Sequence, residues 1–134
     1  MKFHRIIENM IRNICKDYIN SNEEVLFENV TGVSGNIQLS KSVLDFKQLK
    51  IEFTDTVNHS VIEVFSIQNK SFVISETTVD RDGSLYIYTT RYILNSKNIN
   101  LADNNYSSLV IGIDKNIYIT HKNSLKITKV IGIK

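Results

Sequence analysis

The stretch SLKITKVIGIK, residues 124–134, decides the fold. Apolar side chains alternate through it with polar or small ones, which is the period-two pattern of a β-strand. The alternation assigns residues to two faces, with Leu125, Ile127, Lys129, Ile131 and Ile133 on one and Lys126, Thr128, Val130 and Gly132 on the other. We expect an interior or well-paired strand, with Ile127, Ile131 and Ile133 in the core.

The rest of the chain after residue 24 carries the same signature. Leu49-Lys50-Ile51-Glu52-Phe53 alternates cleanly, so one face of that strand should be buried and the other wet. Further strands are predicted at Val25–Val30, Asn36–Leu39, Leu49–Thr54, Val61–Ile67, Ser71–Ile74, Leu85–Leu94, Ser108–Ile113 and Asn116–Thr120. Turn signals such as Thr31–Gly35 and Asp80–Ser84 separate them. Many short strands with regular turns predict an antiparallel β-sandwich, either jelly-roll-like or immunoglobulin-like.

The first twenty residues follow a different period. Their apolar side chains recur at the spacing of an amphipathic helix. This apolar stripe consists of Phe3, Ile6, Ile7, Met10, Ile11, Ile14 and Tyr18. We therefore predict a mainly β protein with one N-terminal amphipathic α-helix, divided into a helix at residues 1–22 and a β-sandwich at residues 23–134.

The stripe leaves two interpretations open. The helix could cover one side of the sandwich, or it could pack on copies of itself or on another protein. Its width suits contact with two neighbours at once, as in a three-helix cluster. The stripe residues are thus the predicted site of oligomerisation or docking.

Composition excludes several classes of partner. The 134 residues carry a formal net charge of +2, too little to indicate binding to nucleic acid or to a membrane surface. The first twenty residues lack the charge pattern of a signal peptide, and the single cysteine, Cys15, allows no intrachain disulfide. We expect synthesis in a cytoplasm.

No constellation of residues predicts catalysis. The three histidines, His4, His59 and His121, are far apart and have no partner at metal-ligand spacing. Asp80-Arg81-Asp82-Gly83 opens like a calcium loop but lacks the later ligands, so a hairpin turn is expected instead. We therefore predict no enzyme activity, no metal and no cofactor.

One aromatic cluster could bind a ligand. Tyr86, Tyr88 and Tyr92 share one face of a predicted strand, with Arg91 beside them. Such a face could stack on a sugar or contact a protein, or it could be the second buried face of a central strand.

Two segments carry a resemblance to a known family. The first is LFENVTGVSGNIQLS at Leu26–Ser40, followed by Phe46 and the strand Leu49–Phe53. The second is NIYIT at Asn116–Thr120, followed by ITKVIGIK at Ile127–Lys134. Together they resemble a β-sandwich module of tailed bacteriophages and prophages of Gram-positive bacteria. The departures from the family pattern are mild: Phe27 at the usual aromatic position, Lys129 for Arg and Ile133 for Tyr.

The resemblance implies a non-enzymatic virion structural protein, made in the bacterial host cytoplasm. A symmetric appendage of this kind would be a homotrimer that contacts other virion proteins. Two positions stay open, one decorating the capsid and one on the tail or baseplate. The alternative function is recognition of a host-surface glycan through the tyrosine face.

Overall fold

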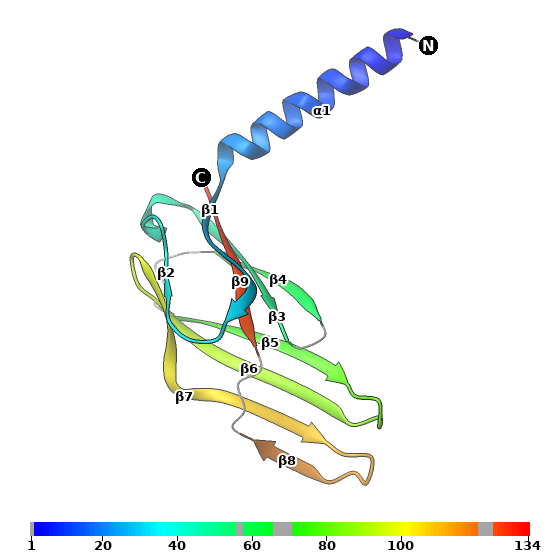
Figure 1. Ribbon diagram of the computed structural model, residues 1–134, viewed down its shortest axis with the longest axis vertical. Helices are drawn as coiled ribbons and strands as arrows, with labels where there is room; N and C mark the ends of the chain where they lie inside the picture. The colour runs from blue at the N-terminus through cyan, green and yellow to red at the C-terminus, as the bar shows by residue number, and fades with distance from the viewer. Residues whose placement is uncertain (1, 56–57, 66–70, 121–124) are drawn as a thin grey trace.

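The computed structural model describes residues 2–55, 58–65, 71–120 and 125–134. Helix α1, Lys2–Asn22, projects away from a body built of β-strands (Figure 1). The strands are β1 Glu23–Val33, β2 Ile37–Gln38, β3 Gln48–Thr54, β4 His59–Phe65, β5 Ser71–Val79, β6 Leu85–Leu94, β7 Asn98–Ile111, β8 Ile117–Thr120 and β9 Lys126–Ile133. A short 3-10 helix, Val43–Asp45, lies between β2 and β3.

The strands form two antiparallel sheets. The first has the order β1-β9-β3-β4 and the second β2-β7-β6-β5, with β8 paired to β7. The predicted β-sandwich with one N-terminal helix is confirmed. In this order β1 pairs with β9 and β2 with β7, a nested arrangement closer to a jelly roll than to the immunoglobulin fold, in which the first strand pairs with the second.

The final strand lies inside its sheet, as the alternation in residues 124–134 predicts. β9 is bonded to β1 on one side and to β3 on the other. β3 alternates strictly, with Leu49, Ile51 and Phe53 at most 2% exposed. These side chains face the second sheet in one core, whose fully or nearly buried members are Leu26, Ile37, Leu39, Val43, Phe46, Leu49, Ile51, Phe53, Ile74, Tyr92, Leu94, Ile99, Leu125, Ile127 and Val130.

The predicted assignment of faces in β9 is wrong beyond Ile127. Phe53 pairs with Ile127 while Glu52 pairs with Lys129, so Thr128 is an extra residue on β9. The Thr128 hydroxyl donates to the Glu52 carbonyl oxygen at 3.2 Å. A bulge of this kind shifts the alternation by one residue. Val130 therefore enters the core, and Lys129 takes the outer face.

After the bulge, each side chain of β9 lies on the face opposite to the one that the sequence alternation predicts. Ile131 is buried at 8% exposure and Ile133 is half-buried, but both lie on the same side of β9 as Lys129, away from the core. Gly132 faces the core instead. A Cβ atom at Gly132 would lie 2.5–2.7 Å from ring atoms of Phe46, so the absence of a side chain is what allows the Phe46 ring to pack there.

The prediction of a strand at Ser108–Ile113 is also wrong in its bounds. β7 begins ten residues earlier, at Asn98, and Ile113 lies in the turn that follows it. Asparagine is depleted in strands, which hid the first half of β7. Pairing with β2 and β6 overrides that preference, since Ile99 is fully buried there.

The Asp80–Ser84 segment is the hairpin turn that its sequence predicts. The Asp80 amide donates to the Ser84 carbonyl oxygen at 2.9 Å, and Gly83 adopts a φ of 84°. The carboxylate of Asp80 accepts from the amide of Arg81, and that of Asp82 accepts from the amide of Ser84. Both acidic side chains therefore serve the turn itself.

We predict that Gly132→Ala lowers the free energy of unfolding by about 1–3 kcal/mol, the usual range for overpacking a core. The added methyl group collides with the buried Phe46 ring, so the ring or the strand must move. Urea unfolding measures the effect. Gly35→Ala is the matched control, because a Cβ atom there meets nothing within 4 Å. Equal stabilities for the two variants would show that Gly132 is not required for packing.

Candidate assembly surface

The apolar stripe of α1 is exposed along its whole length. Phe3 is 75% exposed, Ile14 65% and Tyr18 70%, and even the least exposed member, Ile7, is at 40%. The helix points away from the sandwich and meets it at its C-terminal end, where it runs into β1 (Figure 1). Of the two interpretations of the stripe, the helix as a cover for one side of the sandwich is therefore wrong.

This exposure has an energetic cost in a single chain. Full burial of one aliphatic or aromatic side chain contributes roughly 1.5–3 kcal/mol. In proteins, most of the stability of an amphipathic helix comes from packing of its apolar face rather than from the helix propensity of its residues. α1 would thus gain most of its stability from whatever covers the stripe.

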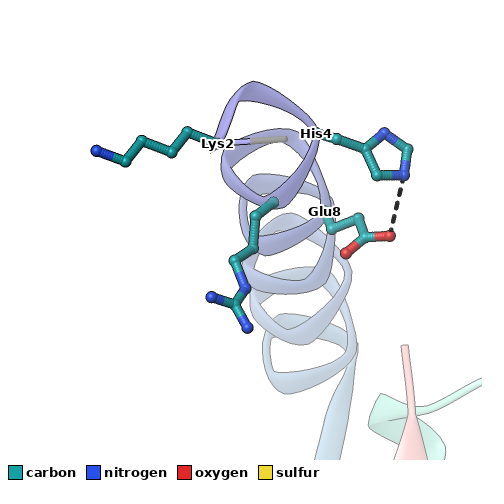
Figure 2. A pocket seen from close by; sticks show the side chains of 4 residues that line it. Lys2, His4 and Glu8 are labelled. Carbon is teal, nitrogen blue, oxygen red and sulfur yellow. Dashed lines mark ion pairs between the residues drawn. The ribbon is translucent and has the colours of Figure 1, made fainter.

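The polar side of α1 offers no comparable site. Figure 2 shows its first turns, where Lys2, His4, Arg5 and Glu8 border a shallow hollow. His4 Nε2 lies 3.3 Å from Glu8 Oε1, and both side chains are more than half exposed. Exposed pairs of this kind contribute little, so this side of the helix is a solvated face.

The junction between α1 and β1 is held by hydrogen bonds. The Ser21 hydroxyl and the Asn22 side-chain amide both donate to the Tyr18 carbonyl oxygen at 2.8 Å, which caps the last turn. The Lys134 amide donates to the Asn22 carbonyl oxygen at 2.9 Å. β1 begins at the next residue, Glu23, which pairs with Lys50 at 3.3 Å. These contacts tie the end of the helix to β9 and β3.

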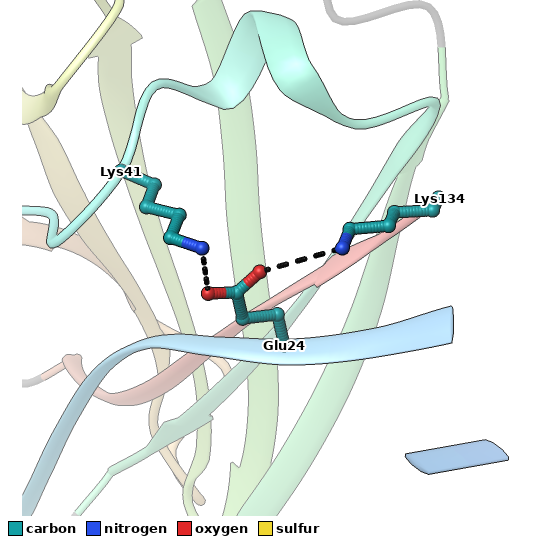
Figure 3. A network of polar contacts seen from close by, with 3 residues as sticks. All are labelled: Glu24, Lys41 and Lys134. Carbon is teal, nitrogen blue, oxygen red and sulfur yellow. Dashed lines mark ion pairs between the residues drawn. The ribbon is translucent and has the colours of Figure 1, made fainter. Parts of the chain in front are cut away.

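A charged group adjoins this junction. Figure 3 shows Glu24 between two lysines, with Lys41 Nζ 2.6 Å from Oε1 and Lys134 Nζ 3.8 Å from Oε2. The hydrogen bond from Lys41 lowers the pKa of Glu24 below its ordinary value. Glu24 thereby links β1 to the segment before the 3-10 helix and to the end of β9.

The tyrosine cluster does not form one surface. Tyr92 is fully buried and stacks on Phe72, with ring centroids 5.5 Å apart. Tyr86 and Tyr88 lie half-buried on the same face of β6 and stack at 6.0 Å. Arg91 lies on the opposite face, where its Nη2 donates to the Ser71 hydroxyl at 3.3 Å. Of the predicted residues, the structure leaves Tyr86 and Tyr88 as an adjacent, partly exposed pair.

A polar cluster that the sequence analysis missed joins the two sheets. Asp55, only 6% exposed, accepts from the Asn58 amide at 2.6 Å and from the Thr78 hydroxyl at 2.7 Å. The Ser60 hydroxyl donates to Glu76 at 2.5 Å. The bonds run from the β3–β4 connection and β4 to β5, so these carboxylates fasten one edge of the sandwich. The one indication of this cluster in the sequence is an acidic residue, Asp55, directly after a strand whose apolar and polar residues alternate without interruption.

The remaining candidates for chemistry stand apart from one another. His4 is on α1, His59 is exposed on β4, and His121 lies outside the described residues. In the described ranges, no three His, Cys, Asp or Glu side chains gather as a metal site would require. Cys15 is a free, exposed thiol on α1. Of the helical segments described, none has the length and apolar character needed to cross a bilayer.

We predict that Glu24 adds stability at neutral pH that is lost in acid. Its folded pKa lies below the ordinary value of 4.5, so the contribution is complete above that pH and disappears as the pH falls through the lower folded pKa. Glu24→Gln should remove this pH dependence in urea unfolding. Lys41→Met is the control, because loss of its hydrogen bond should raise the Glu24 pKa in an NMR titration. An unchanged pKa in that variant would contradict the assignment.

No protein-family model and no curated protein matches the sequence.

Proposed function

We propose that this chain is a structural assembly protein, a small surface component of a bacteriophage virion that attaches through the stripe of α1. The observation that carries the proposal is the row of seven apolar side chains, each 40–75% exposed, on a helix that stands away from the sandwich. Large exposed apolar patches mark protein interaction sites. The virion setting is supported by the resemblance of Leu26–Ser40 and Ile127–Lys134 to the phage sandwich module.

The shape of the stripe favours contact with two further helices. At about 100° per residue, the apolar arc from Ile6 through Phe3 and Ile14 to Ile11 spans about 140°. A two-stranded coiled coil needs only a narrow seam, whereas a wider arc can face two neighbours. A homotrimer with three helices in contact would bury the arc in every copy and leave three sandwiches at one end of the assembly.

The acidic side chains that join the two sheets have structural partners. The carboxylates of Asp55 and Glu76 are engaged in bonds between the two edges of the sandwich. The proposal assigns no reaction to the chain. A position on the capsid and a position on the tail or baseplate are both compatible with it.

Recognition of a host-surface glycan is the alternative proposal. It is supported by the stacked pair Tyr86 and Tyr88, whose partly exposed rings could pack against the apolar face of a sugar. It is the weaker proposal, because Tyr92 is in the core and Arg91 is on the opposite face.

We expect the full chain to self-associate through α1, with a mass near three times the 15.4 kDa of the monomer. Ile14→Glu places a charge in the middle of the stripe, and its burial should cost at least about 2 kcal/mol per copy. Multi-angle light scattering should then show dissociation. Asn9→Glu adds the same charge on the polar side and should leave the mass unchanged. A monomeric parent chain would sink the self-association proposal and leave docking on another protein.

Incorporation into particles tests the virion setting. Phage particles induced from the bacterium that encodes the chain should contain it, as measured by mass spectrometry after density-gradient purification. Replacing the chain with Ile14→Glu should reduce its amount in particles about tenfold or more, while Asn9→Glu is retained. Particles without the parent chain would show that it is not a virion component.

A further inference from the structure

A second unpartnered apolar surface lies at the end of the molecule opposite α1. It is the outer face of β5, β6, β7 and β8 near their hairpin turns, at the bottom of Figure 1. The strand register sets Val79, Leu85, Ile111 and Ile117 side by side in one row. The same register sets Ile87, Leu109 and Ile119 side by side in the next row. These seven aliphatic residues are called the tip face.

The tip face points away from the core of the sandwich. Tyr86 and Tyr88 alternate with its residues along β6, and Tyr88 packs against the core from the other face of the sheet. Val79 is 66% exposed, Ile117 65% and Ile119 70%, and the other four members are half-buried beside them. The two rows therefore form a continuous aliphatic surface that the described part of the chain leaves open.

We propose that the tip face binds the tip face of a second copy of this chain across a two-fold axis. None of its seven members is charged or can form a side-chain hydrogen bond, so a sugar or a charged segment would find no polar partner there. A flat aliphatic face of a sheet is complementary to another such face, which is how two sheets pack in a sandwich. In a two-fold symmetric dimer, each tip face would pack against the same seven residues of the other copy.

The area fits a real but weak contact. From the exposures of its members, the tip face offers on the order of 500 Å² per copy, so a pair would bury about 1,000 Å², at the lower limit for specific interfaces. The rim carries both signs of charge, with Asp80, Arg81 and Asp82 in one turn and Asp114 and Lys115 in the next. With three acidic and two basic residues, the charges of the rim nearly cancel, so repulsion between two copies is weak.

This contact is independent of the helix. Because the two surfaces lie at opposite ends of the molecule, tip contacts would join helix-linked trimers to one another only at concentrations above the dissociation constant of this weak contact.

The test uses the full chain carrying Ile14→Glu, so that any association through α1 is removed. Sedimentation equilibrium should show a concentration-dependent dimer for this chain. Adding Ile119→Lys should raise the dissociation constant about tenfold or more, because each copy would then bury a charge. Adding Val30→Lys is the matched control, since Val30 is 92% exposed on β1, outside the tip face, and should leave the dimer unchanged.

Two results would overturn the proposal. One is a folded Ile14→Glu chain that stays monomeric at every concentration. The other is a monomeric chain that floats with phosphatidylcholine vesicles and loses flotation with Ile119→Lys, which would make the tip face a lipid-binding surface. If the parent and Ile14→Glu chains have equal masses, the helix proposal fails, and the Ile119→Lys comparison still decides the tip face.

Discussion

The pairing of β9 with β1 and β3 is the interaction on which the rest of the structure depends. Residues from both ends of the chain meet in this sheet, so closing it brings together segments separated by more than a hundred residues. Gly132 leaves space for the Phe46 ring, and the bulge at Thr128 turns Val130 into the core. The same strand positions the helix, because the Lys134 amide bonds to the last carbonyl group of α1.

A sandwich completed in this way needs nothing from α1 for its core. The helix can therefore stand clear of the body, and its apolar stripe remains available to other chains. The second sheet also presents a hydrophobic outer face, at its far end, where β7 and β8 extend it. Two apolar surfaces at opposite ends are compatible with the proposed assembly role, in which neighbouring copies would cover the exposed apolar area.

The spacing of apolar residues along the sequence predicts much of the fold by itself. The sequence pattern correctly predicts two strands, at Leu49–Phe53 and Leu85–Leu94, and the turn at Asp80–Ser84. The first half of β7 is not predicted, since its asparagines disfavour a strand until β2 and β6 pair with it. The tyrosine cluster shows a related limit. The alternation of residues correctly predicts that the three rings share one face of β6. The burial of each ring depends on how much of it the opposite sheet covers, so Tyr92 is buried and Tyr86 and Tyr88 are half-buried.

The sequence by itself determined the composition of the two parts, an amphipathic helix followed by alternating strands, because the periods of 3.6 and 2 are local properties of the chain. It also determined the residues of the helical stripe. Only the tertiary structure decided which faces are covered. The phase of β9 after Thr128, the exposure of the stripe and the existence of the tip face all depend on contacts between segments distant in sequence. The hydrophobic periodicity of the sequence does not reveal such contacts. One extra residue in a strand, or the packing of one sheet over another, changes which side chains are buried without changing the local sequence pattern.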